Sequence, residues 1–239
     1  MKCITQSLKT GTISLVDAPI PTPLEGQLII ETTYSVISSG TEKMLIDFGK
    51  SNPIDKIKKQ PDKFKEVINK VKTDGLAVTY DAVKSKLDNP IYPGYSNVGK
   101  VVAIGPNVKG FQIGDRVVSN GPHAEFVAVK QNLCAIVPDS LTDKEASFTV
   151  LTSIGLQGTR LAKPCFGETF LVVGLGLIGL LTCQILKSQG VNVIGLDPDR
   201  KKCNLAEKIG VKVILYLVLL SILVFLSMKK IWSRVNPEV

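Results

Sequence analysis

The stretch Thr169–Asp199, TFLVVGLGLIGLLTCQILKSQGVNVIGLDPD, constrains the fold more than any other part of this sequence. A short apolar run at 170–173 is typical of a buried parallel strand, and it leads directly into the motif Gly174-Leu-Gly-Leu-Ile-Gly179. An apolar helical stretch then ends at Gly190, and a second apolar run ends on Asp197. This order of strand, glycines, helix, strand and acid predicts a parallel βαβ unit that binds a dinucleotide.

The glycines and the acid have separate physical roles in such a site. Gly174 allows the tight turn, Gly176 lets the backbone approach a pyrophosphate, and Gly179 lets the helix lie close to the sheet. Asp197 follows at the distance from which a carboxylate accepts a hydrogen bond from a ribose 2′-hydroxyl. The predicted cofactor-binding residues are Gly174, Leu175, Gly176, Leu177, Ile178, Gly179, Asp197 and Arg200. The alternative is a structural βαβ turn without a ligand.

The preferred cofactor follows from the charge at the end of the second strand. A 2′-phosphate would meet the negative charge of Asp197, so this acid favours NAD over NADP. The nearby cation Arg200 works against that preference.

The net charge of +8 is concentrated in one stretch. Between Lys50 and Lys72, eight lysines outnumber Asp55, Asp62 and Glu66 by five, and apolar residues recur among them at helical spacing. A solvated helix face explains this pattern, and a polyanion site is the alternative. No nucleic-acid partner is predicted, because no aromatic residues are interleaved and no nucleic-acid motif is present.

The first 145 residues have the pattern of short strands and turns that is typical of a small β domain. Short strands are expected over residues 1–36, helical pieces from about 42 to 88, and short strands separated by glycines after Pro90, which suggests a closed or half-closed β-barrel. Ser140 or Thr142 is expected to cap a following helix. The N-terminus has no apolar signal-peptide core, and the five cysteines are scattered, as in a reducing cytoplasm.

The chain resembles the medium-chain dehydrogenase/reductase family. The glycine and valine spacing that carries this resemblance is found at Gly94, Gly99, Val101, Gly105, Val108, Gly114, Asp115 and Val117. The segments SSGTEKMLIDFGK, KQPDKFKEVINKVKTDGL, GYSNVGKVV, SNGPHAE and FTVLTSIGLQG are similar to the N-terminal half of two-part oxidoreductases from bacterial surface-polysaccharide genes. The resemblance covers about residues 1–212 and stops near Lys212.

This resemblance implies an α/β plus β architecture. A GroES-like β-barrel domain is expected at 1–145 with a helical insertion at about 42–88. An incomplete doubly wound (Rossmann) parallel sheet with the NAD site is expected at 146–215, and an apolar and basic tail at 216–239. The implied activity is that of an NAD(H)-dependent oxidoreductase of the medium-chain type, acting on a small molecule such as a sugar or sugar-nucleotide. A homo-oligomer is one option for its assembly.

The resemblance also indicates a site without zinc or another metal. Zinc-dependent members have a cysteine at the position of Ser39 and a His-Glu pair at the positions of Tyr95 and Ser96, and hydroxyls are poor zinc ligands. Hydrogen-bond donors must then polarise the substrate carbonyl. The resemblance assigns Ser39, Thr41 and Tyr95 to the cleft, and His123 is the one histidine of the chain. Structural hydrogen bonding is the alternative role for each of these four catalytic candidates.

The C-terminal run Val213–Met228 has sixteen residues without charge and is followed by Lys229, Lys230 and Trp232. A transmembrane helix at 213–228 that anchors a cytoplasmic enzyme is one interpretation, and a buried strand plus core helix is another. A frame disruption near Lys212 is the third. Half of a doubly wound sheet leaves an unpaired strand edge. The alternative function is therefore a truncated, membrane-associated and non-catalytic remnant.

Overall fold

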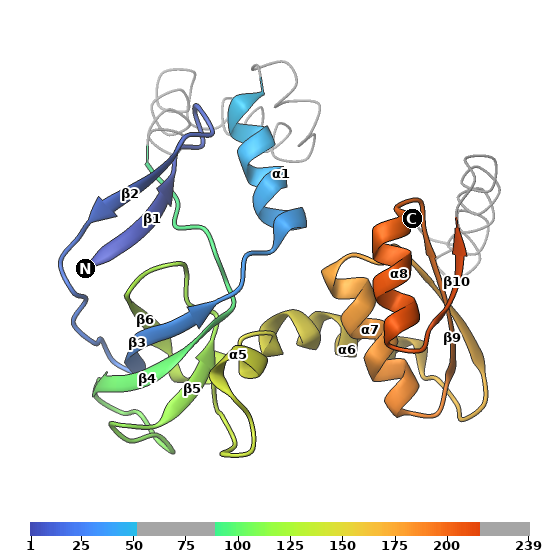
Figure 1. Cartoon of the computed structure of the whole chain (residues 1–239). Helices are drawn as coiled ribbons and strands as arrows, with labels where there is room; N and C mark the ends of the chain where they lie inside the picture. The colour runs from blue at the N-terminus through green and yellow to red at the C-terminus, as the bar shows by residue number, and fades with distance from the viewer. Residues whose placement is uncertain (52–88, 216–239) are drawn as a thin grey trace, which may run out of the picture. The chain divides into compact units, whose positions relative to one another are not determined.

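The protein, in a computed structural model, is described over residues 1–51 and 89–215 (Figure 1). It divides into two compact units, unit 1 with residues 1–150 and unit 2 with residues 151–239. Most of the predicted helical insertion at 42–88 and the predicted tail at 216–239 lie outside the described residues. The domain boundaries at 145 and 215 stay predictions.

A five-stranded antiparallel sheet forms the centre of unit 1 (Figure 1). Its spatial order is β6-β3-β4-β5-β7, with the strands β3 (Gln27–Ser35), β4 (Asn97–Ile104), β5 (Arg116–Ser119), β6 (Phe126–Lys130) and β7 (Cys134–Ile136). A 3-10 turn, η1 (Gln131–Leu133), separates β6 from β7. Alternate apolar side chains on these strands enter one core. The core residues are Leu28, Ile30, Val101, Val117, Val127 and Val129.

A hairpin precedes this sheet in the chain, and a helix lies between two of its strands. β1 (Lys2–Gln6) pairs with β2 (Ile13–Asp17) in an antiparallel hairpin, and α1 (Ser39–Lys50) follows β3. A Cβ atom on Gly49 of α1 would lie 2.5 Å from the Cα atom of Gly11 in the hairpin turn. The end of α1 therefore packs directly on the hairpin. Among the described residues the strand order does not close into a barrel, and single bridges from Cys3 to Ala124 and from Gln6 to Ile91 join the hairpin to the segments before β6 and β4.

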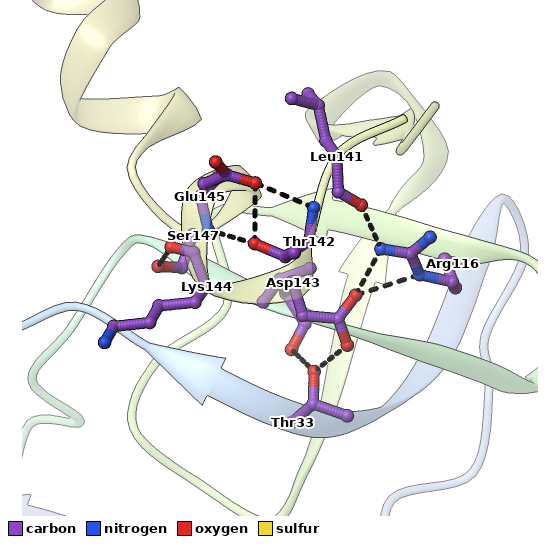
Figure 2. A network of polar contacts seen from close by, with 9 residues as sticks. Thr33, Arg116, Leu141, Thr142, Asp143, Lys144, Glu145 and Ser147 are labelled. Atoms are coloured by element: carbon purple, nitrogen blue, oxygen red, sulfur yellow. Dashed lines mark hydrogen bonds and ion pairs between the residues drawn. The ribbon is translucent and has the colours of Figure 1, made fainter. Parts of the chain in front are cut away.

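A polar network joins α5 (Asp143–Ala146) to the sheet (Figure 2). Asp143 Oδ1 accepts hydrogen bonds from Nε and Nη2 of Arg116 at 2.9 and 2.7 Å, and Asp143 Oδ2 accepts one from Thr33 Oγ1 at 2.8 Å. Burial raises the pKa of Asp143, but the hydrogen bonds from Thr33 and Arg116 and the charge of Arg116 outweigh it, so the pKa lies below its usual value. Of the two predicted caps it is Thr142 that begins α5, in a capping box with Glu145.

Unit 2 contains a three-stranded parallel sheet in the order β10-β9-β8. Its strands are β8 (Thr169–Val173), β9 (Asn192–Asp197) and β10 (Lys212–Leu215), connected by α7 (Leu177–Ser188) and α8 (Arg200–Lys208). Both connections are βαβ crossovers, which are almost always right-handed, so the two helices cover one face. They bury Leu175, Cys183, Leu186, Val191, Val193, Cys203, Ala206 and Val211. Cys183 and Cys203 are thus core residues.

The other face of this sheet is exposed in the described structure. Phe170 and Val172 pack against the core, whereas the alternating residues Leu171 and Val173 are 49% and 54% exposed. Among the described residues β8 pairs only with β9. Within residues 1–51 and 89–215, β8 is therefore an edge strand. α6 (Thr149–Ala162) precedes β8 along the chain and contacts α7 where Gly155 approaches Thr182.

The predicted membrane helix at 213–228 does not begin at Val213. Residues 213–215 belong to β10, in which Leu215 pairs with Asp197 of β9. The remainder of that span lies outside the described residues. In the ranges 1–51 and 89–215, no helix combines the length and the apolar character that a membrane crossing needs.

Candidate functional site

The glycine loop between β8 and α7 has the geometry that its sequence predicts. Gly174 has φ +92°, in the left-handed region that favours glycine, and its N–H donates to Leu196 O at 2.8 Å. A Cβ atom on Gly179 would overlap the carbonyl oxygen of Gly174, so the first turn of α7 lies tightly against the loop. A Cβ atom on Gly176 would meet nothing within 4 Å. The backbone is therefore open to a ligand at Gly176.

The N-terminus of α7 opens onto this loop. Gly176 is the N-cap residue, and no side chain caps the helix. The N–H groups of the first turn have no partner within an α-helix, and the helix dipole makes them attractive to an anion. Leu175 is buried, Leu177 and Ile178 are half-buried, and Gly176 is exposed. The loop therefore presents exposed backbone at Gly176, next to the uncapped start of α7.

Asp197 ends β9 and points at the glycine loop. Its side chain accepts hydrogen bonds from the backbone N–H of Leu175 at 2.8 Å and of Asp199 at 2.8 Å, and Lys202 Nζ lies 3.7 Å from Oδ1. Burial raises the pKa of this carboxyl, but the two N–H groups and the Lys202 ammonium outweigh it, so its pKa lies below the usual value. A carboxylate has about four acceptor positions, so two remain unused, but the Asp197 side chain is only 4% exposed.

The cation nearest to this acid differs from the predicted one. Arg200 is exposed and lies 3.7 Å from Glu207 along α8. Lys202, in the first turn of α8, contacts Asp197 instead. Asp199 caps that helix by accepting a hydrogen bond from Lys201 N. Arg200 and Lys202 both fall in the first turn of α8, so the sequence alone does not decide which of them contacts Asp197.

Two of the predicted catalytic hydroxyls meet. Thr41 Oγ1 and Tyr95 Oη are 3.3 Å apart, and Ser38 Oγ donates to Thr41 Oγ1 at 3.5 Å. The Thr41–Tyr95 contact is exposed to solvent. Ser39 is the first residue of α1 and lines a hollow on the hairpin side of that helix. Ser96 is buried and donates to Ser147 O at 2.6 Å, so its hydroxyl is already engaged.

His123 belongs to a different cluster from the Thr41–Tyr95 pair. Its Nε2 lies 3.2 Å from Glu42 Oε2, its Nδ1 lies 2.9 Å from Ser35 Oγ, and the side chain is 7% exposed. Glu42 Oε1 also accepts a hydrogen bond from Ser38 N at 2.8 Å. Sequence analysis did not single out Glu42, although its position one turn after Ser38 suits a helix start. In the described ranges, no three His, Cys, Asp or Glu residues converge as metal ligands.

Comparisons with known proteins agree with this architecture. The family model described as "Alcohol dehydrogenase GroES-like domain" matches residues 66–141. An alcohol dehydrogenase of Moraxella sp. (strain TAE123) is 25% identical over 207 residues, which are 71% of this chain and 61% of that protein. D-guloside 3-dehydrogenase of Escherichia coli (strain K12) is 32% identical over 117 residues, 47% of this chain and 33% of that protein.

A solved structure extends the likeness across both units. The structure described as a short chain alcohol dehydrogenase from E. coli CFT073 with NADH has a TM-score of 0.69 and 21% identity, and the match covers 90% of this chain and 62% of that one. At this identity the likeness concerns the fold. The chain spans less than two thirds of the length of each of these relatives. The chain is therefore similar to alcohol dehydrogenase-like oxidoreductases, over residues 66–141 for the domain model and over 207 residues for the Moraxella dehydrogenase.

Proposed function

We propose that this chain is the dinucleotide-binding part of an NAD(H)-dependent oxidoreductase that works without zinc. One observation carries the proposal: the Asp197 carboxylate, at the tip of β9, contacts the N–H of Leu175 beside the open backbone of Gly176. In a parallel sheet this corner is where the ribose and the pyrophosphate of a dinucleotide meet. The nicotinamide supplies or accepts the hydride when the cofactor is bound.

The roles of the binding residues follow from their charges. The N–H groups at the start of α7 hold the pyrophosphate, and Gly176 gives it room. Asp197 accepts a hydrogen bond from the ribose hydroxyl, and its negative charge disfavours a 2′-phosphate. Lys202, 3.7 Å away, and the exposed Arg200 reduce but do not reverse that preference. NAD(H) is therefore the proposed cofactor.

The substrate side of the proposal rests on hydroxyl groups in place of a metal. Thr41 and Tyr95 form a hydroxyl pair that can donate to a carbonyl oxygen and hold a proton there. Ser39 and Tyr95 are poor zinc ligands, and the hydroxyl of Ser96 is bound to Ser147 O. A sugar or sugar-nucleotide substrate is supported by the resemblance to surface-polysaccharide enzymes and by the name of the D-guloside 3-dehydrogenase relative. The unpaired cysteines suit the cytoplasm.

Thermal unfolding of the full chain with NADH or NADPH tests the cofactor proposal. A ligand at one hundred times its Kd adds about 2.7 kcal/mol, which raises the Tm by about 5–10 °C for a chain of this size. The substitution Asp197→Asn is expected to reduce the rise in Tm caused by NADH. It is also expected to narrow the difference between the Tm shifts caused by NADH and by NADPH. Asp199→Asn is the matched control, because asparagine also caps a helix. Equal NADH and NADPH shifts in all three proteins would refute the assignment of Asp197.

A non-catalytic remnant that binds nucleotide weakly or not at all is the second candidate. No contact among the described residues favours it over the oxidoreductase. Its membrane association has no support among the described helices. Absence of NADH-induced stabilisation and of turnover of any carbonyl sugar would favour the remnant, and turnover would exclude it.

A further inference from the structure

The strand β2 lies at an exposed edge of unit 1 (Figure 1). Among the described residues it pairs only with β1. The side chains of Ile13 and Leu15 are 50% and 66% exposed, and the side chain of Asp17 is exposed as well. An exposed edge strand that carries large apolar side chains is a template for pairing with another chain.

The register of the hairpin shows which backbone groups of β2 point outward. Ser7 N donates to Thr12 O at 2.9 Å, so the even-numbered residues of this segment exchange their hydrogen bonds with β1. The N–H and C=O groups of Ile13, Leu15 and Asp17 therefore point away from β1. Because side chains alternate along a strand, these three residues also share one face. The edge thus combines free ladder groups with an apolar surface.

A second copy of β2 fits this edge in one antiparallel register. With Ser14 opposite Ser14, Ile13 of each copy lies opposite Leu15 of the other. The backbone groups of both residues point outward, so each of these pairs can exchange two hydrogen bonds. Their side chains meet on the same face as apolar cross-strand pairs. The neighbouring register, with Leu15 opposite Leu15, would instead place Ile13 opposite the charged Asp17.

The same register brings opposite charges together. Asp17 of the second copy lies opposite Gly11, and a Cβ atom on Gly11 would lie 2.8 Å from Cγ of Lys50. The side chain of Lys50, at the end of α1, therefore occupies the face that Asp17 of the other copy approaches. Lys50 is exposed, and within its own chain Asp17 contacts only the exposed Lys2, at 3.2 Å. Two-fold symmetry forms the Asp17–Lys50 contact twice.

We propose that β2 joins two copies of this chain through an antiparallel β2–β2 pair with Ser14 on the two-fold axis. The two hairpins then form one four-stranded sheet, and Ile13 and Leu15 of each copy are covered by those of the other. The contact involves little more than two short strands and is smaller than a standard protein interface, so the expected Kd is about 10–100 µM.

Sedimentation of the full chain at concentrations below and above this Kd tests the proposal. We expect a monomer–dimer equilibrium, and Leu15→Lys is expected to raise the Kd by at least about tenfold, because it replaces both apolar pairs with a charge. Ile113→Lys is the matched control, since Ile113 lies between β4 and β5 and is 67% exposed. It should leave the Kd unchanged. A monomer at every concentration, or a dimer that Leu15→Lys does not weaken, overturns the proposal.

Disulfide formation tests the register. Residue 14 faces its own copy in a non-hydrogen-bonded pair, with Cβ atoms about 4.5–5.5 Å apart, so Ser14→Cys is expected to cross-link two chains under mild oxidation. The control Val16→Cys lies on the same face of the strand, but the two copies of residue 16 are about 13 Å apart. Mass spectrometry of the linked peptides separates this disulfide from any at the exposed Cys165. Equal cross-linking of the two variants, or none in Ser14→Cys, overturns the proposal.

A charge exchange tests the contact between Asp17 and Lys50. Asp17→Lys and Lys50→Asp each place like charges together in the dimer, so each is expected to raise the Kd by about threefold to tenfold at low salt. The double variant restores the opposite charges and is expected to return the Kd close to that of the wild type. A double variant that dimerises as weakly as the single variants contradicts the proposed register.

Discussion

The glycine loop of unit 2 and the polar clusters of unit 1 are assembled in different ways. The loop and its acid lie within residues 174–197, and the acid accepts a hydrogen bond from a backbone N–H of the loop. In unit 1, Thr41 meets Tyr95 across 54 residues, and Glu42 meets His123 across 81. A candidate site made of local backbone can be proposed from a sequence, because the strand, the glycines, the helix and the acid follow one another along the chain. A site made of distant side chains cannot, because the pairing depends on the packing of the fold.

The largest effect on stability and on NADH binding is expected from Gly179→Ala, which changes the contact between the glycine loop and α7. The added methyl would overlap Gly174 O, and the loop is held by the bond from Gly174 N to Leu196 O. We expect a loss of about 3 kcal/mol in the free energy of unfolding, measured with urea, and loss of the NADH-induced stabilisation. The control is Gly158→Ala in α6, where a Cβ atom meets nothing within 4 Å. It should stabilise by up to about 1 kcal/mol. Wild-type behaviour of Gly179→Ala would contradict the close packing of loop and helix.

A smaller but substantial effect is expected from His123→Leu in unit 1. The substitution leaves Glu42 buried without its imidazole partner, which lies 3.2 Å away in the wild type. We expect the free energy of unfolding to fall by about 2 kcal/mol. His123→Gln is the control, since one amide hydrogen bond to Glu42 should restore about half of the loss. Equal losses for the two variants would mean that packing, not the polar contact, is what His123 provides.

Removal of the charge of Asp143 is expected to lower the free energy of unfolding by an intermediate amount that depends on pH. Because the folded pKa of Asp143 is lowered, its contribution is complete above the unfolded pKa of about 3.9 and is lost as pH falls through the folded value. Asp143→Asn should therefore cost about 1 kcal/mol at pH 7, and the difference from wild type should shrink below about pH 4. Urea midpoints of the wild type and of Asp143→Asn between pH 7 and 3 measure this difference in stability. The exposed Asp139→Asn should follow the wild type throughout, and a constant difference for Asp143→Asn would count against the ion pair.

The smallest effect on stability is expected from Tyr95→Phe. The contact between Tyr95 Oη and Thr41 Oγ1 is long, at 3.3 Å, and exposed. We expect the free energy of unfolding to change by less than about 0.5 kcal/mol, measured in the same way. In any assay in which the wild type turns over a substrate, the turnover rate of Tyr95→Phe should be about 100-fold lower. A loss of stability as large as that of His123→Leu would make this hydroxyl pair structural.

The same contrast explains what the sequence could predict. The parallel strands β8 and β9, the turn at Gly174 and the acid at the end of β9 follow from local patterns, and the sequence offers Thr142 as one of two caps. The partners of His123 do not, because Glu42 reaches it only through the packing of α1. The partner of Asp197 could not be fixed either, since Lys202 and Arg200 are both in the first turn of α8 and only the helix geometry distinguishes them.

The most direct test of the backbone site is the amide NMR spectrum of the full chain during addition of NADH. The account predicts saturable shifts of the N–H resonances of Gly176, Leu177 and Ile178, with weaker affinity in Asp197→Asn. If NADH leaves these three amides unchanged at saturating concentration, the glycine loop is not a dinucleotide site and the oxidoreductase proposal is wrong.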